Sequence, residues 1–252
     1  MKRILLVFSI LAAVVISPLA NESKQRFDKG AEYYRNGDFR TAADIWTDLY
    51  NSGYDNFELL YNLGNAWFKL EEIPLSVIFY ERALLRRPMD DDARYNLSIA
   101  KTLTRDRYET IPEIFLIRWY NLSALALSSD RWAVISLTCF IVSLSLMLLF
   151  LFTSRYRLKR IAFLISVFLF VASAASFLFS LRNSKLVYNN PEAVILSPVI
   201  TGRSAPSESG QELFVIHEGL KVKTGEQIGE WCEIRLPDGN RGWVPVTSFE
   251  RI

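Results

Sequence analysis

The chain has 252 residues, half of them hydrophobic, and a formal net charge of only +2. Its charged residues are unevenly distributed, because two runs of 21 residues, 132–152 and 161–181, contain no Asp, Glu, Lys or Arg. This distribution argues against a single soluble core. The small basic excess lies between these runs and at the N-terminus, which argues against a nucleic-acid-binding protein.

Residues 1–20 have the order of a secretory signal. Lys2 and Arg3 precede an apolar run over 4–16, which is followed by Ser17, Pro18, Leu19 and Ala20. The run is short for a membrane-spanning helix. Because Pro18 fits a cleavage site after Ala20 poorly, an uncleaved signal anchor is the alternative. Either form predicts export of the chain from residue 21 onward.

Residues 23–108 contain a sequence repeat with a period of 34 residues. Gly30 recurs as Gly64, Trp46 as Tyr80, and Tyr61-Asn62-Leu63 as Tyr95-Asn96-Leu97. Small residues at this period let two helices approach closely, and aromatic side chains fill the gaps between hairpins. The pattern resembles the tetratricopeptide repeat family, through Leu63, Gly64, Trp67, Ser76, Tyr80, Ala83 and Pro88.

This resemblance implies all-α helical hairpins over 23–56 and 57–90 and a capping helix over 91–106, with an irregular helical bundle as the alternative. In such arrays the first helix of each hairpin lines a concave groove, which we expect to hold Phe27, Tyr34, Tyr61, Asn65, Phe68, Lys69 and Tyr95. The lysines and the arginine of the family's carboxylate clamp do not occur there.

The aromatic side chains and the amide predict that this repeat groove binds an apolar segment of a partner protein, with Asn65 bonding to its backbone. Alternatively, the face packs against residues 113–127 of the same chain.

Residues 113–128 are apolar but have Arg118 at their centre and Trp119-Tyr120 beside it. We predict an interfacial helix lying on the membrane surface, with a soluble connector as the alternative. The runs 132–152 and 161–181 each match a hydrocarbon core about 30 Å thick and are predicted to span the membrane. Serines seven residues apart in each run predict that the two helices pack as a transmembrane hairpin; they are Ser136, Ser143, Ser166, Ser173 and Ser180.

The distribution of charge predicts the orientation. The loop 153–160 holds four basic residues and no acidic one, whereas residues 21–110 contain 13 basic and 16 acidic residues and residues 183–252 contain 7 and 9. Basic loops are retained in the cytoplasm. We therefore expect a bacterial inner-membrane protein with a cytoplasmic loop and periplasmic N- and C-terminal domains.

Residues 192–252 have the short alternating runs and turn residues of an all-β barrel. The sequences Gly229-Glu230-Trp231, Asp238-Gly239 and Gly242-Trp243-Val244 resemble the bacterial SH3-like (SH3b) family. Two interpretations are open for Trp231 and Trp243, which can pack in the core or rim of the barrel or form a ligand face.

The sequence contains no catalytic constellation. His217 is its single histidine, and it has no P-loop, Gly-x-Gly-x-x-Gly or Cys-x-x-Cys motif. We expect no enzymatic activity, no cofactor and no metal.

Taken together, these segments predict a multidomain membrane protein. The order of the segments along the chain resembles that of the BatE-type proteins of bacterial aerotolerance (Bat) operons. This resemblance implies a scaffold for protein–protein interaction, Bat-type partners with von Willebrand A domains, and a role in aerotolerance or stress. Two rival interpretations are a cell-envelope anchor whose SH3-like domain binds peptidoglycan peptides, and a regulatory subunit of an envelope enzyme.

Overall fold

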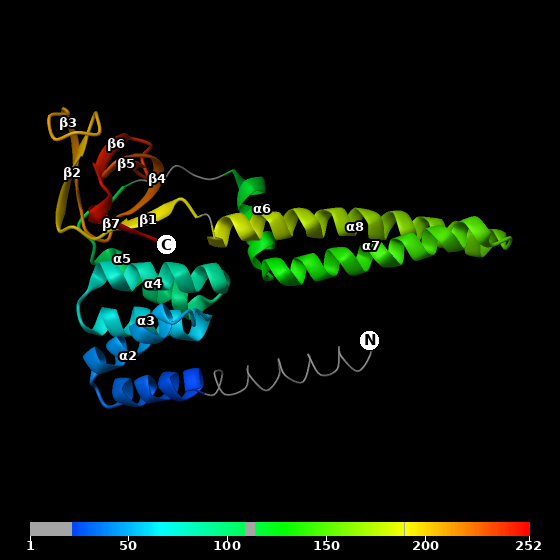
Figure 1. The fold of residues 1–252 in the computed structure, drawn as a ribbon, viewed down its shortest axis with the longest axis horizontal. Helices are drawn as coiled ribbons and strands as arrows, with labels where there is room; N and C mark the ends of the chain where they lie inside the picture. Colours follow the sequence, from blue (N-terminus) through cyan, green and yellow to red (C-terminus); the bar gives the residue numbers. More distant parts are fainter. Residues whose placement is uncertain (1–21, 109–113, 189) are drawn as a thin grey trace. The chain divides into compact units, whose positions relative to one another are not determined.

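The computed structural model describes residues 22–108, 114–188 and 190–252. The predicted signal segment and the first residue of the predicted interfacial helix lie outside these ranges. The described chain is mostly helical and ends in an antiparallel sheet (Figure 1), as the sequence predicts. It divides into two compact units. The first consists mainly of the helices before residue 109 and the C-terminal strands, and the second consists mainly of residues 110–190.

Helical hairpins form the first part of the first unit. Residues 22–35 are helical, and they are followed by α2 (Phe39–Asn51), α3 (Phe57–Lys69), α4 (Ile73–Arg86) and α5 (Asp91–Thr102). The side chains of Asp38, Asn56 and Asp90 cap α2, α3 and α5 by accepting a backbone N–H three residues later. Gly37 lies in the turn between the first two helices with a φ of 84°, a conformation that favours glycine.

The 34-residue sequence period corresponds to equivalent contacts between helices. A Cβ atom on Gly30 would lie 2.4 Å from Trp46 Nε1, and one on Gly64 would lie 2.6 Å from Tyr80 Cδ1. Each aromatic ring therefore lies directly against glycine backbone, where any side chain would collide with it. The close approach of helices predicted from these glycines is confirmed.

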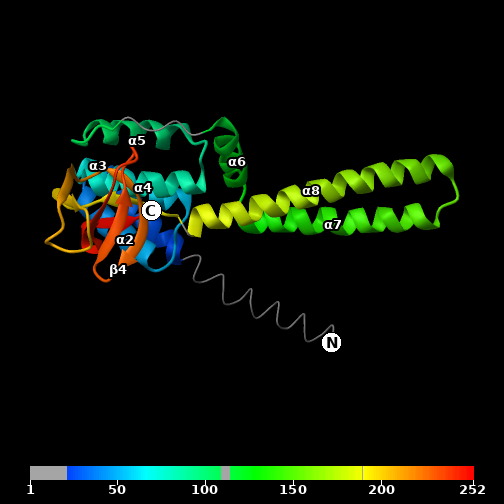
Figure 2. The ribbon, with the colours of Figure 1, turned by 90° about the horizontal axis from the view of Figure 1, so that it is seen from above.

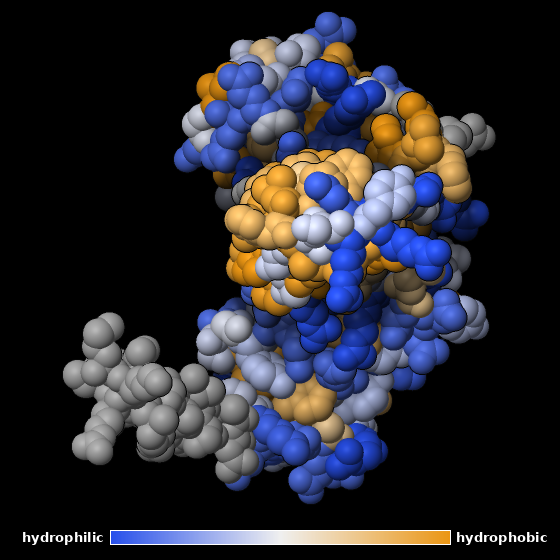
Figure 3. Space-filling view, turned by 90° about the vertical axis from the view of Figure 1, so that its right-hand side faces the viewer, coloured by the Kyte–Doolittle hydropathy of each residue, from blue (hydrophilic) through white to orange (hydrophobic). Residues whose placement is uncertain are grey.

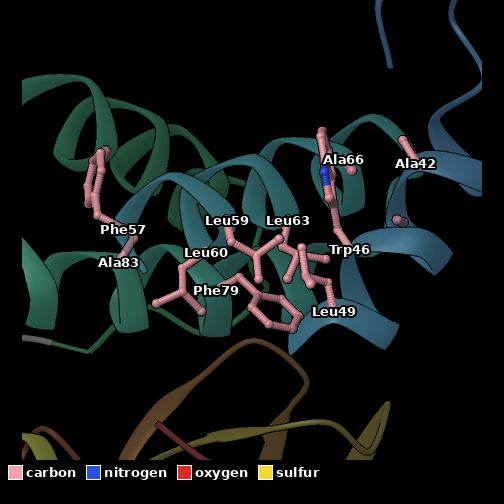
Figure 4. Packing of buried hydrophobic residues seen from close by; sticks show 12 residues of the cluster. Ala42, Trp46, Leu49, Phe57, Leu59, Leu60, Leu63, Ala66, Phe79 and Ala83 are labelled. Carbon is pink, nitrogen blue, oxygen red and sulfur yellow. The ribbon is translucent and has the colours of Figure 1, made fainter. Parts of the chain in front are cut away.

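Buried side chains from α2, α3 and α4 form the core of the hairpins. Figure 4 shows Trp46, Leu49, Leu63 and Phe79 pointing toward one another, and each is at most 6% exposed. Each such side chain contributes about 1.5–3 kcal/mol by leaving water. This core holds the first helix of each hairpin in place, and those helices carry the predicted repeat groove.

The C-terminal strands form one seven-stranded sheet in the order β3-β2-β6-β5-β4-β1-β7, with every pair antiparallel. Alternate residues point into its core, including Ile216, Val222, Ile234 and Val244. The strands are β1 (Glu192–Ile195), β2 (Val199–Arg203), β3 (Glu212–His217), β4 (Lys221–Ile228), β5 (Trp231–Arg235), β6 (Arg241–Pro245) and β7 (Phe249–Arg251).

Helix α4 and the sheet share a core that the sequence does not predict. Val77 and Ile78 of α4 are fully buried in one cluster with Val194 of β1. Polar contacts surround this cluster. The carboxylate of Glu81 accepts a bond from Lys221 of β4 at 2.8 Å, and Arg82 donates to Glu250 of β7 at 2.7 Å. The strands therefore cover α4 and protect part of the end of the helical array from solvent.

The second unit consists of α6 (Phe115–Leu125), α7 (Ser129–Phe152) and α8 (Tyr156–Tyr188). Helices α7 and α8 lie side by side in both views (Figures 1 and 2). Three pairs of serines join them, and in each pair both hydroxyls donate to the partner's backbone carbonyl at 2.8–3.2 Å. The pairs are Ser129 with Ser180, Ser136 with Ser173, and Ser143 with Ser166.

These bonds confirm that the two helices pack as a hairpin through the predicted serine faces. The helices are longer than the predicted spans, since α7 has 24 residues and α8 has 33. By length and composition each is suited to cross a membrane. Their outward surfaces are apolar (Figure 3), with Phe168 70% and Leu151 61% exposed.

Helix α6 is hydrogen-bonded to the C-terminal part of α8, just after the apolar run 161–181. Asn121 accepts a bond from Arg182 Nε at 2.9 Å, and Asn183 donates to the backbone carbonyls of Ala124 and Leu127 at 3.1 and 3.0 Å. The N-terminal side chains of α6 are largely exposed; they include Phe115 at 76%, Leu116 at 69% and Trp119 at 56%.

Candidate functional site

A hydrogen-bonded cluster of four polar side chains lies on the first helix of the second hairpin and its neighbours. Tyr61 and Asn65 come from α3, Tyr80 from α4 and Asn96 from α5. Asn65 Oδ1 accepts from the Tyr80 hydroxyl at 2.6 Å and from Asn96 Nδ2 at 3.0 Å. Asn96 Nδ2 also donates to the Tyr61 hydroxyl at 3.0 Å. The cluster thus joins three helices through one amide oxygen.

These bonds fix the orientation of the Asn65 side chain. Burial, reinforced by the neighbouring Tyr61, raises the pKa of Tyr80, so its hydroxyl stays protonated as a donor. Within the described residues, Asn65 Nδ2 and Asn96 Oδ1 form no hydrogen bond. One amide donor and one amide acceptor therefore remain for a ligand, and this pair matches the C=O and N–H of a peptide backbone.

The first hairpin contributes Phe27 and Tyr34, which are both half-buried. The Phe27 ring lies 6.0 Å from that of Trp46, whose Nε1 donates to the Phe27 carbonyl at 3.1 Å. The Tyr34 ring lies 5.8 Å from that of Trp46. Burial raises the pKa of Tyr34, and Tyr61 adds to this effect. Tyr34 and Tyr61 both pack against the buried core of the hairpins.

The remaining predicted groove residues lie farther out. Phe68 is half-buried and packs against the cluster that α4 shares with β1. Lys69 is exposed, and with Phe68, Glu71, Ile73 and Leu103 it lines a shallow hollow. Tyr95 is 67% exposed, and it is the next residue, Asn96, whose side chain enters the cluster. The structure thus joins Tyr61 and Asn65 through Asn96, places Tyr34 against Trp46, and leaves Lys69 and Tyr95 exposed to solvent.

Sequence reasoning did not include Tyr80 and Asn96 among the site residues. The signal was present, because Asn96 belongs to the repeated Tyr-Asn-Leu motif and Tyr80 stands at the period of Trp46. The motif predicted a helix contact, but the bonds to Asn65 depend on where α5 lies against α3.

Trp231 and Trp243 lie on the outer face of the sheet. Trp231 is paired with Pro245 and Trp243 with Glu233, and both tryptophans alternate with buried residues such as Cys232 and Val244. Both are half-buried, and neither belongs to the core cluster of the sheet. This position favours a rim or ligand-face role for the two rings.

Within the described ranges, no group of three or more His, Cys, Asp or Glu side chains is arranged to hold a metal ion. Comparison with family models and with curated proteins finds no match for the chain.

Proposed function

We propose that this chain is a membrane-anchored scaffold that captures a segment of a partner protein in the groove of its helical hairpins. The observation that carries the proposal is the Asn65 amide. Its oxygen is fixed by Tyr80 and Asn96 while its NH2 group is left for a ligand, beside the half-buried ring of Tyr61. Such a site recognises a peptide backbone and adjacent apolar side chains.

In this proposal the hairpins are tetratricopeptide repeats, the C-terminal sheet is an SH3-like barrel, and α7 and α8 anchor the protein in a bacterial inner membrane. The glycine contacts at the 34-residue period support the first assignment, and the exposed apolar surface of α7 and α8 supports the third. A Bat-type complex with von Willebrand A-domain partners, linked to aerotolerance or stress, remains part of the proposal through the resemblance of the segment order.

A second candidate is an envelope anchor that binds peptidoglycan peptides. It is favoured by the position of Trp231 and Trp243 on the outer face of the sheet, where aromatic rings are open to a ligand. Retention of the detergent-solubilised protein on isolated murein, lost when both tryptophans are replaced by alanine, would support it.

The proposed groove is tested by crosslinking in native membranes and identification of the partners. Tyr61→Ala combined with Asn65→Ala should abolish partner capture. A sharper variant is Asn65→Asp, because its oxygen can still accept from Tyr80 and Asn96 while the free NH2 donor is lost. Loss of one such bond should weaken capture about tenfold.

The matched control is Asn62→Asp, which makes the same change on the same helix outside the cluster and should leave capture unchanged. Hydrogen–deuterium exchange of α3 and α4 checks that each variant is folded. Undiminished capture by folded Asn65→Asp and by the double alanine variant would rule the groove out.

The proposed orientation places residues 153–160 in the cytoplasm, and it places the helical hairpins and the C-terminal sheet in the periplasm. In a chain with Cys139 and Cys232 replaced by serine, Ser209→Cys should react with an impermeant maleimide in intact spheroplasts. Ser154→Cys should react only after lysis, because the basic loop is retained inside. The reverse labelling pattern would contradict the proposed topology.

A further inference from the structure

Three cationic side chains form one row across the outer face of the sheet. Lys223 of β4 stands directly opposite Arg235 of β5, which stands directly opposite Arg241 of β6. Directly paired residues share a face, and neighbouring strands lie about 4.8 Å apart, so the row spans about 10 Å. All three residues are exposed, and they alternate with buried residues such as Val222 and Ile234.

This arrangement is unfavourable for the sheet itself, because like charges directly opposite one another destabilise a strand pair. Within the described residues, none of the three cations forms an ion pair. The nearest carboxylates have other contacts. Glu192, opposite Lys223, pairs with Lys221 at 2.7 Å, and Asp238 in the β5–β6 turn accepts from Asn240 N and Nδ2. Glu233 lies toward Gly225, where a Cβ would be 2.8 Å from its Oε2.

We propose that this row, Lys223, Arg235 and Arg241, binds an extended acidic segment of a partner protein. Guanidinium groups bind carboxylates with two parallel hydrogen bonds. Side chains on one face of an extended peptide are about 7 Å apart, so two carboxylates at alternate positions fit within the length of the row.

The aromatic side chain beside the row adds a second element of recognition. Trp243 is two residues from Arg241 on the same face of β6, and it is half-buried. Its ring can cover an apolar side chain that precedes or follows the acidic residues. This inference rests on the proposed role in protein–protein interaction, but it concerns a surface separate from the Asn65 groove.

The test uses the full chain in detergent micelles and a fluorescein-labelled peptide in which glutamate alternates with serine before a terminal leucine. The peptide should bind at low salt and weaken as salt rises. The triple variant Lys223→Gln, Arg235→Gln and Arg241→Gln should bind about tenfold more weakly or worse. A peptide with glutamine in place of each glutamate should not bind.

The matched control removes the same charge elsewhere, with Lys29→Gln, Arg35→Gln and Arg105→Gln at exposed positions of the helical part, and it should bind as the unmodified chain does. The melting temperature of the row variant should stay the same or rise, because repulsion is relieved. A large fall in that temperature would identify the row as structural and overturn the proposal.

Equal binding of the row variant or of the glutamine peptide would also overturn it, as would binding only to phosphatidylglycerol vesicles or murein fragments. Loss of peptide binding in Asn65→Asp would indicate that the peptide had entered the groove. The failure of this inference and the failure of the proposed groove are therefore distinguishable.

Discussion

Replacing Gly64 with valine should unfold the second helical hairpin. A Cβ atom at this position would lie 2.6 Å from Tyr80 Cδ1, and the Tyr80 side chain is only 1% exposed and bonded to Asn65. The ring therefore has no room to move away. Overpacking of a well-packed core costs about 1–3 kcal/mol and sometimes more. Because valine is branched at Cβ, we expect a loss of stability at the upper end of this range, about 3 kcal/mol.

Hydrogen–deuterium exchange of α3 and α4 measures this effect separately from α7 and α8. Lys69→Val is the matched control, because it places the same side chain on the same helix at an exposed position and should cost less than about 1 kcal/mol. Tyr80→Leu should partly rescue Gly64→Val by removing the ring, so that the two changes are not additive. Full protection of Gly64→Val from exchange would contradict the close packing of Tyr80 against Gly64.

The sequence predicted those parts of the fold that depend on local chemistry or on a strong period. Asp38 and Asp90 cap helices, as Asp commonly does, and the glycines at the 34-residue period lie against aromatic rings. The heptad serines also meet, since two long apolar helices joined by a short loop have few alternative ways to pack.

What the sequence could not predict depends on contacts between distant segments. Asn96 enters the cluster because α5 packs on α3, and no spacing within α5 indicates this. The cation row was also missed, because β-strand register decides whether Lys223, Arg235 and Arg241 are neighbours. Register follows from turns and bulges such as the shift in β4, which composition and alternation locate poorly.

The joint between α4 and the sheet is the largest of these unpredicted contacts. Glu81 is 8% exposed and its carboxylate binds two ammonium groups, Lys101 at 2.7 Å and Lys221 at 2.8 Å. Lys221 also pairs with Glu192 at 2.7 Å. Near the sheet, Asp106 accepts from the backbone N–H of His217 at 2.6 Å. Together with the Arg82–Glu250 pair and the core that α4 shares with β1, these bonds attach the strands to the helices.

Glu81→Ala should loosen this joint by about 1.5–3 kcal/mol, because it removes two charged hydrogen bonds and leaves the partly buried Lys221 ammonium group with Glu192. Exchange should rise in α4, β1 and β4 together. Glu250→Gln removes the same charge at the more exposed pair with Arg82, and it should cost no more than about 1 kcal/mol. Equal effects of the two variants would show that the buried network does not hold the joint.

The pH dependence gives an independent check on the same network. Burial alone would raise the pKa of Glu81, but Lys221 and Lys101 outweigh it and lower the pKa from 4.5 to about 2. A carboxyl group with a lowered folded pKa contributes stability above its unfolded pKa, and this stability is lost as pH falls through the folded value. Between about pH 4.5 and pH 2, the unmodified chain should therefore lose more stability than Glu81→Gln, whose side chain does not titrate. Parallel pH profiles for the two proteins, followed by exchange of α4 and β1, would mean that Glu81 is not ionised and paired in the folded state.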